Sequence, residues 1–148
     1  MTEVRFYHLQ RQRLEEALPA LLAKARERGH RIVVQASSPE RVRALDALLW
    51  TWRPETFLAH GSPVTGMAEE QPIWLTHLDE CPNEADLLVL VDGAQADIGR
   101  YALCCELFDG LDDEAVAEAR RCWTEYKAKG HVLTYWQQSD RGGWEKRA

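Results

Sequence analysis

Apolar residues in the first part of the chain follow two spacings, one typical of strands and one typical of helices. Residues 4–9 (VRFYHL) and 31–35 (RIVVQ) are short runs with β-branched or aromatic side chains, and both predict strands. Between these runs, apolar residues recur at helical spacing: Leu14, Leu18, Leu21 and Ala25. Gly29 is a natural helix end. Pro19 leaves two possibilities, a helix that begins near it or a helix that is kinked there.

A second helix is predicted directly after the second strand. Ser37 and Ser38 are both suitable N-caps, and Pro39 fits the first turn of a helix. With Ser37 as the cap, Glu40 is placed to complete a capping box. We expect this helix to run to about Trp52, because a proline follows shortly afterwards.

The rest of the chain continues the alternation of strands and helices. Three strands are predicted at 72–75, 86–93 and 101–108, and the middle one is a continuous apolar run typical of a strand covered on both faces. The clearest helix pattern covers 112–130, with acids in its first turn and lysines in its last, and a final strand follows at 131–136. This alternation predicts a layered α/β fold with a largely parallel or mixed sheet.

Length and composition fit one globular domain. The 148 residues, of which 45% are hydrophobic and 28% charged, suffice for one buried core, so we expect a single domain over 1–148. No apolar run reaches the roughly 20 residues of a membrane-spanning helix, and the first residues lack the apolar centre of a signal peptide. The four cysteines form no CxxC pair, which favours buried reduced thiols over a zinc site or disulfides. We therefore expect a cytoplasmic protein with no membrane partner.

The formal net charge of -6 is distributed unevenly along the chain. Residues 1–78 are nearly neutral, with ten Lys or Arg and nine Asp or Glu. Residues 79–118 hold twelve acids and one base, whereas 119–148 hold seven bases and three acids. A broad DNA-binding face is usually basic, so this distribution favours a small anionic partner that binds near the basic end.

The sequence lacks the common catalytic and cofactor-binding motifs. It contains no GxGxxG or GxxxxGK[ST] phosphate loop, no GxSxG nucleophile turn and no HExxH metal helix. The five histidines are scattered. We expect no catalytic site, no metal and no cofactor, and hence a binding module rather than an enzyme.

The second helix carries more large apolar side chains than one core face needs. One sector of the helix forms the predicted core face: Val42, Leu45, Leu48, Leu49 and Trp52. Trp50 projects instead on the side of Arg43 and Asp46, and Phe57 follows shortly after the helix. Two interpretations fit, a neighbouring loop that covers these rings or a hydrophobic protein interface.

The last helix combines an apolar strip with cations. Its predicted core strip consists of small and aromatic residues: Ala115, Ala119, Cys122 and Tyr126. The adjacent strip places Val116 and Trp123 alongside Arg120 and Lys127. An arginine can hold a carboxylate through two hydrogen bonds, so this strip suits a ligand with a carboxylate and an apolar group. A solvated face with Trp123 resting on the arginine explains the same spacing.

Together these segments resemble the chi subunit of bacterial DNA polymerase III. The resemblance rests on LDxxLW and FLxH within 45–60 and on ARxxWxxYKxxGH within 119–131, and it extends to the ending YWQQSDRGGWEKRA. It implies a three-layer α/β/α fold, Rossmann-like but without a nucleotide-binding loop. It also implies a non-catalytic accessory subunit of the replicase, without a cofactor.

The resemblance further implies two protein partners. One is the psi subunit, expected in a 1:1 heterodimer that tethers chi to the clamp-loader complex, and the other is the acidic C-terminal tail of single-stranded DNA-binding protein. The implied tail-binding residues are Val116, Arg120, Trp123 and Lys127. The implied psi-binding residues are Leu49, Trp50, Phe57 and His60. Relatives can carry a base at the position of Val116, so Lys127 or the terminal cations are expected to supply charge here.

Two other functions stay open on the sequence alone. Trp136, Trp144 and the basic end fit direct binding of a single-stranded nucleic acid by stacking. An α/β scaffold also fits a degenerate enzyme that binds a nucleotide. Because the rest of the chain is acidic, we expect no strong direct DNA binding.

Overall fold

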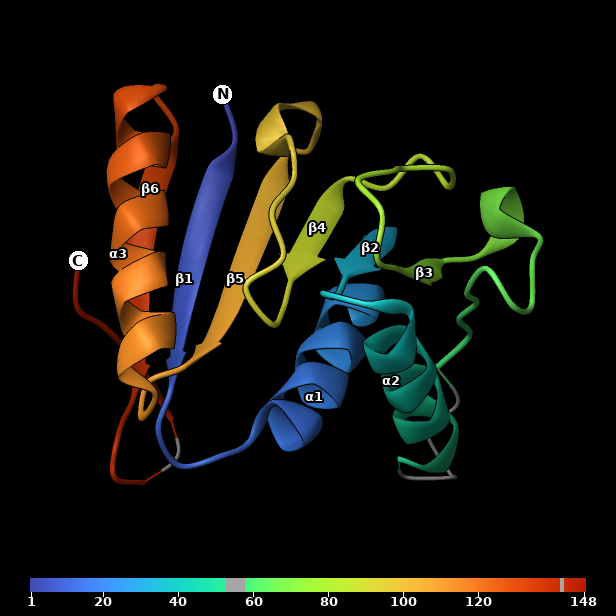
Figure 1. Ribbon diagram of the computed structural model, residues 1–148, viewed down its shortest axis with the longest axis horizontal. Helices are drawn as coiled ribbons and strands as arrows, with labels where there is room; N and C mark the ends of the chain where they lie inside the picture. The colour runs from blue at the N-terminus through green and yellow to red at the C-terminus, as the bar shows by residue number, and fades with distance from the viewer. Residues whose placement is uncertain (53–57, 142) are drawn as a thin grey trace.

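The computed structural model describes residues 1–52, 58–141 and 143–148. In these residues, a seven-stranded sheet carries three α-helices (Figure 1). The strands are β1 (Glu3–Leu9), β2 (Ile32–Gln35), β3 (Ile73–Thr76), β4 (Leu87–Leu90), β5 (Leu103–Asp109), β6 (Val132–Gln138) and β7 (Trp144–Lys146). The helices are α1 (Leu14–Glu27), α2 (Pro39–Thr51) and α3 (Asp113–Ala128).

The strand order in the sheet is β3-β2-β4-β5-β1-β6-β7. Every neighbouring pair is parallel except β6 and β7, which are antiparallel. The predicted α/β fold with a largely parallel or mixed sheet is therefore confirmed. Because the strands are parallel, the carboxyl-terminal ends of β1, β4 and β5 lie on the same side of the sheet, and their arrowheads point downward in Figure 1.

The helices cover both faces of the sheet and form a three-layer arrangement. Leu87 and Val89 of β4 pack in the cluster that contains α1 and α2. Leu88 and Leu90 pack on the opposite face, in the cluster that contains α3. This two-sided burial explains why β4 reads as a continuous apolar run rather than an alternating one.

Helix α1 includes Pro19 in its interior, so of the two possibilities that the sequence left open, the start near that proline is wrong. The helix begins at Leu14, and Pro19 is buried together with Leu18 and Leu22. The missing N–H of a proline removes one helical hydrogen bond. The buried ring offsets part of this loss through apolar contact.

Helix α2 is capped by Ser38, whose Oγ accepts a hydrogen bond from the backbone N–H of Arg41 at 3.2 Å. Of the two candidate caps, Ser38 is confirmed, and the alternative with a capping box from Ser37 to Glu40 is wrong. With Ser38 as the N-cap, the third helical residue is Arg41, which has no carboxylate to close the box.

Strand β7 has no counterpart in the predicted elements. It pairs three residues with β6, and all three side chains are exposed. A strand this short and polar lacks the alternating apolar pattern by which strands are predicted. It places Trp144 over Tyr7 of β1, with ring centroids 5.0 Å apart.

The four cysteines are free thiols. Cys104, Cys105 and Cys122 are buried, and Cys81 is partly exposed. Burial raises the pKa of Cys105 to about 12 and that of Cys122 to about 11, so these thiols are poor nucleophiles at neutral pH.

Candidate functional site

The cations on the exposed side of α3 differ in whether they form ion pairs. Arg121 is bound by Glu118 and Glu125, with N–O distances of 2.6 and 3.0 Å. Arg120 and Lys127 are exposed and form no ion pair within the part of the chain that the structure describes. A cation without an internal carboxylate partner keeps its charge available for an incoming anion.

The apolar part of the α3 strip is packed against the sheet. The ring of Trp123 lies 5.4 Å from Phe6 and 6.1 Å from Tyr135 between centroids. Val116 is also partly buried. Trp123 is thus partly exposed and packed against the sheet on its other side, a contact that the spacing of α3 alone does not reveal.

Three residues that the sequence analysis did not single out lie beside this strip: His8, Phe108 and Tyr135. His8 Nδ1 is 2.6 Å from the Tyr135 hydroxyl, and the His8 and Phe108 rings are 5.2 Å apart. The Phe108 and Tyr135 rings are 6.0 Å apart. Together with Trp123, these rings form an aromatic surface, which we call the α3 aromatic cluster.

Arg120 lies close enough to this cluster to act on its titratable groups. Burial lowers the pKa of His8, and the Arg120 charge acts in the same direction, while a backbone hydrogen bond with Gly110 and the Asp109 charge oppose it. Burial raises the pKa of Tyr135, and the Arg120 charge opposes that change. At pH 7 His8 is therefore mostly neutral, and Arg120 is the cation of the cluster.

Gly110 gives His8 the space for this position. A Cβ atom at Gly110 would lie only 1.9 Å from Cδ2 and Nε2 of His8. The Gly110 N–H also donates to the carbonyl of Leu9 at 2.7 Å, which fixes the turn after β5 against β1. A side chain at this position would displace the His8 ring.

The sequence indicated only one of the three added members of the α3 aromatic cluster. Tyr135 lies in the last predicted strand, next to the basic end of the chain. His8 and Phe108 are far apart in the sequence, and the register of β1 with β5 pairs them directly. Strand order cannot be read from hydrophobic periodicity, so the sequence analysis did not find this pair.

A second candidate surface lies at the end of α2. Trp50 is 53% exposed, as the helical spacing predicts, and its ring is 4.8 Å from that of His60. The His60 side chain is fully buried, and its Nδ1–H donates to the carbonyl of Leu58 at 2.7 Å. His60 Nε2 also lies 3.0 Å from Asp46 Oδ1, at an angle unfavourable for a hydrogen bond. His60 therefore supports Trp50 from within the protein.

The other two residues expected at this surface differ from Trp50. Leu49 is only 3% exposed and belongs to the core cluster beneath α2. Phe57 lies outside the described residues. Trp50 is thus the residue of this group that the structure places at the surface.

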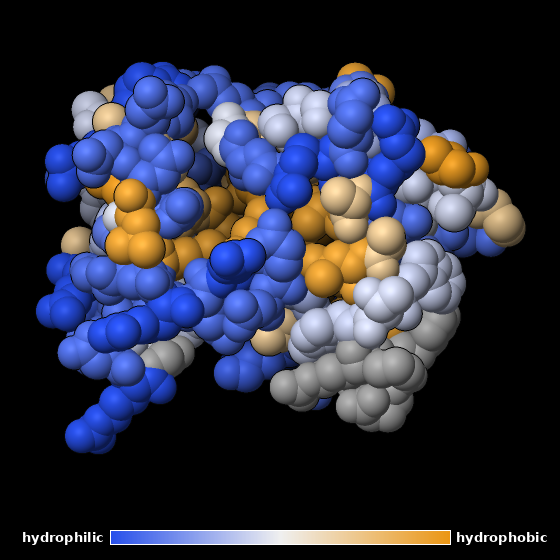
Figure 2. Space-filling model, turned by 60° about the horizontal axis from the view of Figure 1, so that its bottom comes forward, coloured by the Kyte–Doolittle hydropathy of each residue, from blue (hydrophilic) through white to orange (hydrophobic). Residues whose placement is uncertain are grey.

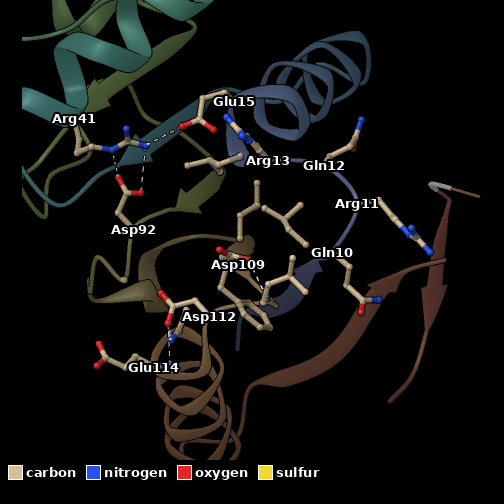
Figure 3. A pocket seen from close by; sticks show the side chains of 17 residues that line it. Gln10, Arg11, Gln12, Arg13, Glu15, Arg41, Asp92, Asp109, Asp112 and Glu114 are labelled. Atoms are coloured by element: carbon tan, nitrogen blue, oxygen red, sulfur yellow. Dashed lines mark hydrogen bonds and ion pairs between the residues drawn. The ribbon is translucent and has the colours of Figure 1, made fainter. Parts of the chain in front are cut away.

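A large cavity of about 800 Å³ lies at the carboxyl-terminal edge of the sheet, between the segments that follow β1, β4 and β5. Figure 2 views this edge and shows apolar surface in a hollow with a hydrophilic rim. Arg41 binds Asp92 at 2.8 Å and lies 3.8 Å from Glu15 (Figure 3). The 17 lining residues include no histidine, cysteine or serine.

Three further features were sought among the described residues: a metal-binding cluster, a membrane-spanning helix and a glycine-rich turn for phosphate. Residues 1–52, 58–141 and 143–148 contain no group of three or more His, Cys, Asp or Glu placed to hold a metal ion. Within the same ranges, no helix has the length and apolar character needed to span a bilayer. The segment 10–13 after β1 contains no glycine, unlike the phosphate-binding turn of dinucleotide-binding folds.

Comparisons with known proteins agree with this description. Residues 1–134 match the family described as DNA polymerase III chi subunit, HolC. The probable DNA polymerase III subunit chi of Rickettsia prowazekii (strain Madrid E) is 26% identical over 91 residues. That match covers 62% of this chain and 55% of the relative, so the chain spans about half the length of the curated relative.

One solved structure, the C-terminal domain of the DEAD-box protein Dbp5, matches with a TM-score of 0.31 and 12% identity. That match covers 90% of this chain and 74% of the other, and a likeness this low carries no argument about function. The family match, in contrast, includes β1 to β5 and all of α3. This chain belongs to the family of DNA polymerase III chi subunits.

Proposed function

We propose that this protein is a non-catalytic accessory subunit of the replicative DNA polymerase III holoenzyme in the cytoplasm. In this role it links the acidic C-terminal tail of single-stranded DNA-binding protein to the clamp-loader complex through psi. Family membership supports the replication role. The observation that supports the tail-binding part is the position of Arg120 beside the α3 aromatic cluster, where it forms no ion pair with any described residue.

In the proposed tail site, Arg120 holds the free terminal carboxylate through two parallel hydrogen bonds. The last apolar side chain of the tail packs against Val116, Trp123 and the exposed parts of the α3 aromatic cluster. Lys127 attracts the acids that precede it. Micromolar affinity requires about 8 kcal/mol, which one charge-assisted contact and one apolar anchor can supply after the cost of ordering the peptide.

Titration with a fluorescent peptide of the cognate acidic tail tests this site. We expect Arg120→Ala to weaken binding at least tenfold, because the carboxylate loses its partner. Arg121→Ala is the matched control, since Glu118 and Glu125 already neutralise Arg121. Equal loss in both variants would show that general positive charge, rather than this site, binds the tail.

In the proposed psi site, Trp50 is the anchor and His60 holds its ring from beneath. Large aromatic side chains contribute much of the energy of protein interfaces when a partner covers them. Leu49 supports the site as a core residue, and Phe57 remains part of the proposal from the resemblance.

Co-purification with psi tests this second site. We expect Trp50→Ala to lower the yield of a 1:1 complex strongly and Thr51→Ala to leave it unchanged. Thr51 is an exposed neighbour whose hydroxyl bonds carbonyls of its own helix. Full psi binding by Trp50→Ala would reject this assignment.

A further inference from the structure

Helices leave part of the sheet uncovered on the α1 side. The core on this side joins α1 and α2 mainly to β2, β3, β4 and β5, and β1 contributes Tyr7. Beside α1, a groove of about 420 Å³ extends along β1, β5 and β6. Trp144 of β7 lines the same groove. The antiparallel strand β7 therefore forms one side of this groove, which the helices do not fill.

The groove is cationic although the protein is acidic. The described residues that line it include Arg5, Lys24, Arg28 and His30 but no aspartate or glutamate. Arg5 and His30 already bind carboxylates that lie outside the lining. Lys24 and Arg28, about one turn apart at the end of α1, are exposed and form no ion pair with any described residue. Two cations are thus available at the rim.

Apolar and aromatic side chains form the rest of the groove. Leu103 and Leu107 of β5 lie beneath it. Tyr7 and Trp144 pack edge to face, and Trp136 stands on the neighbouring strand. Trp144 keeps 36% of its surface exposed. A ligand in this groove would bury aliphatic and aromatic surface below and meet positive charge at the rim.

We propose that this groove binds an acidic peptide segment of a partner protein through leucine or phenylalanine side chains. The charge complementarity with Lys24 and Arg28 attracts the acids, and the groove takes up the apolar side chains. A single-stranded nucleic acid fits less well, because Leu103 and Leu107 beneath the groove offer no stacking face to a base.

This proposal is independent of the proposed tail site. The groove lies on the α1 side of the sheet, whereas Arg120 belongs to α3 on the opposite face. Trp136 and Trp144 also follow the residues 1–134 that match the family, so the groove depends on a part of the chain beyond that match. A test can therefore separate the two sites.

The probes are octapeptides that alternate Asp or Glu with Leu or Phe, acetylated at one end and amidated at the other. The amide removes the free carboxylate that the proposed tail site requires. NMR of the indole N–H groups of the six tryptophans follows binding to the full chain. We expect saturable shifts at Trp136 and Trp144, unchanged by Arg120→Ala, and at least tenfold weaker binding by the double variant Lys24→Glu with Arg28→Glu.

The control is Arg43→Glu with Lys129→Glu, which reverses two exposed cations outside the groove. We expect it to change binding less than twofold, with the thermal midpoint of each variant confirming that it folds. Equal weakening in both double variants, or no saturable shift at millimolar peptide, would overturn the proposal. Stronger binding of oligothymidylate at the same indoles would also overturn it and identify a nucleic-acid surface.

Discussion

Arg120 and Arg121 are adjacent in the sequence, but their surroundings differ. Arg121 is neutralised by two glutamates on its own helix, whereas Arg120 forms no ion pair with any described residue and its charge acts on His8 and Tyr135. The helical spacing identified Arg120 as a candidate, because it stands one turn from both Val116 and Trp123. Spacing alone did not show that His8 and Tyr135 would face it, since those contacts depend on the order of the strands.

Glu106 is a buried carboxyl group whose protonation should affect the stability of the protein. Its Oε1 accepts a hydrogen bond from the Tyr126 hydroxyl at 3.1 Å, and burial beneath α3 raises its pKa from the ordinary 4.5 to about 7. Between these values the folded protein binds more protons than the unfolded chain, so the free energy of unfolding falls as pH rises. We predict that Glu106→Gln removes this fall and raises the free energy of unfolding at pH 8 by ~2 kcal/mol.

Urea denaturation at pH 5 and pH 8 measures this effect. Glu114→Gln is the control, because Glu114 is exposed in the first turn of α3 and its substitution should leave the pH dependence in place. The same pH dependence in wild type and Glu106→Gln would contradict the buried-carboxyl explanation.

At the scale of elements, hydrophobic periodicity predicted the six parallel strands and the three helices. It left two helix starts undecided and did not predict one strand. The start of α1 lies before a buried proline, the cap of α2 is Ser38 rather than Ser37, and β7 is too short and polar to produce a pattern.

The cap of α2 can be tested directly. Ser38→Ala removes the acceptor for the Arg41 N–H, so we expect the free energy of unfolding to fall by about 1 kcal/mol. Ser37→Ala should change it by no more than a few tenths of this, because Ser37 is exposed and lies outside the cap. Chemical denaturation measures both, and a larger loss from Ser37→Ala would favour the alternative cap, Ser37 with a capping box to Glu40.

At the scale of the whole molecule, the layers place the proposed tail site and the groove on opposite faces of the sheet. The sequence predicted the basic end and the acidic middle, and it identified Trp50 as a misplaced apolar residue. It did not reveal that β7 would bring Trp144 over β1. Such pairings join distant segments and follow from packing rather than from local pattern.

The proposed tail site should depend on salt. Carboxylates of the tail meet Arg120 and Lys127 at an exposed surface, where the Debye length is about 8 Å at physiological salt. We predict that affinity for the tail peptide falls severalfold as NaCl rises from about 50 to about 500 mM. Fluorescence anisotropy measures this dependence, and constant affinity over the range would show that charge contributes little.

We propose that one protein connects psi to the acidic tail through two separate surfaces. The most direct test is to immobilise psi, add this protein, and measure retention of a fluorescent tail peptide. We predict retention only when this protein is present, with Arg120→Ala losing the peptide but keeping psi, and Trp50→Ala losing psi but still binding the peptide in solution. Loss of both partners by either folded variant, or peptide retention without this protein, would contradict the account.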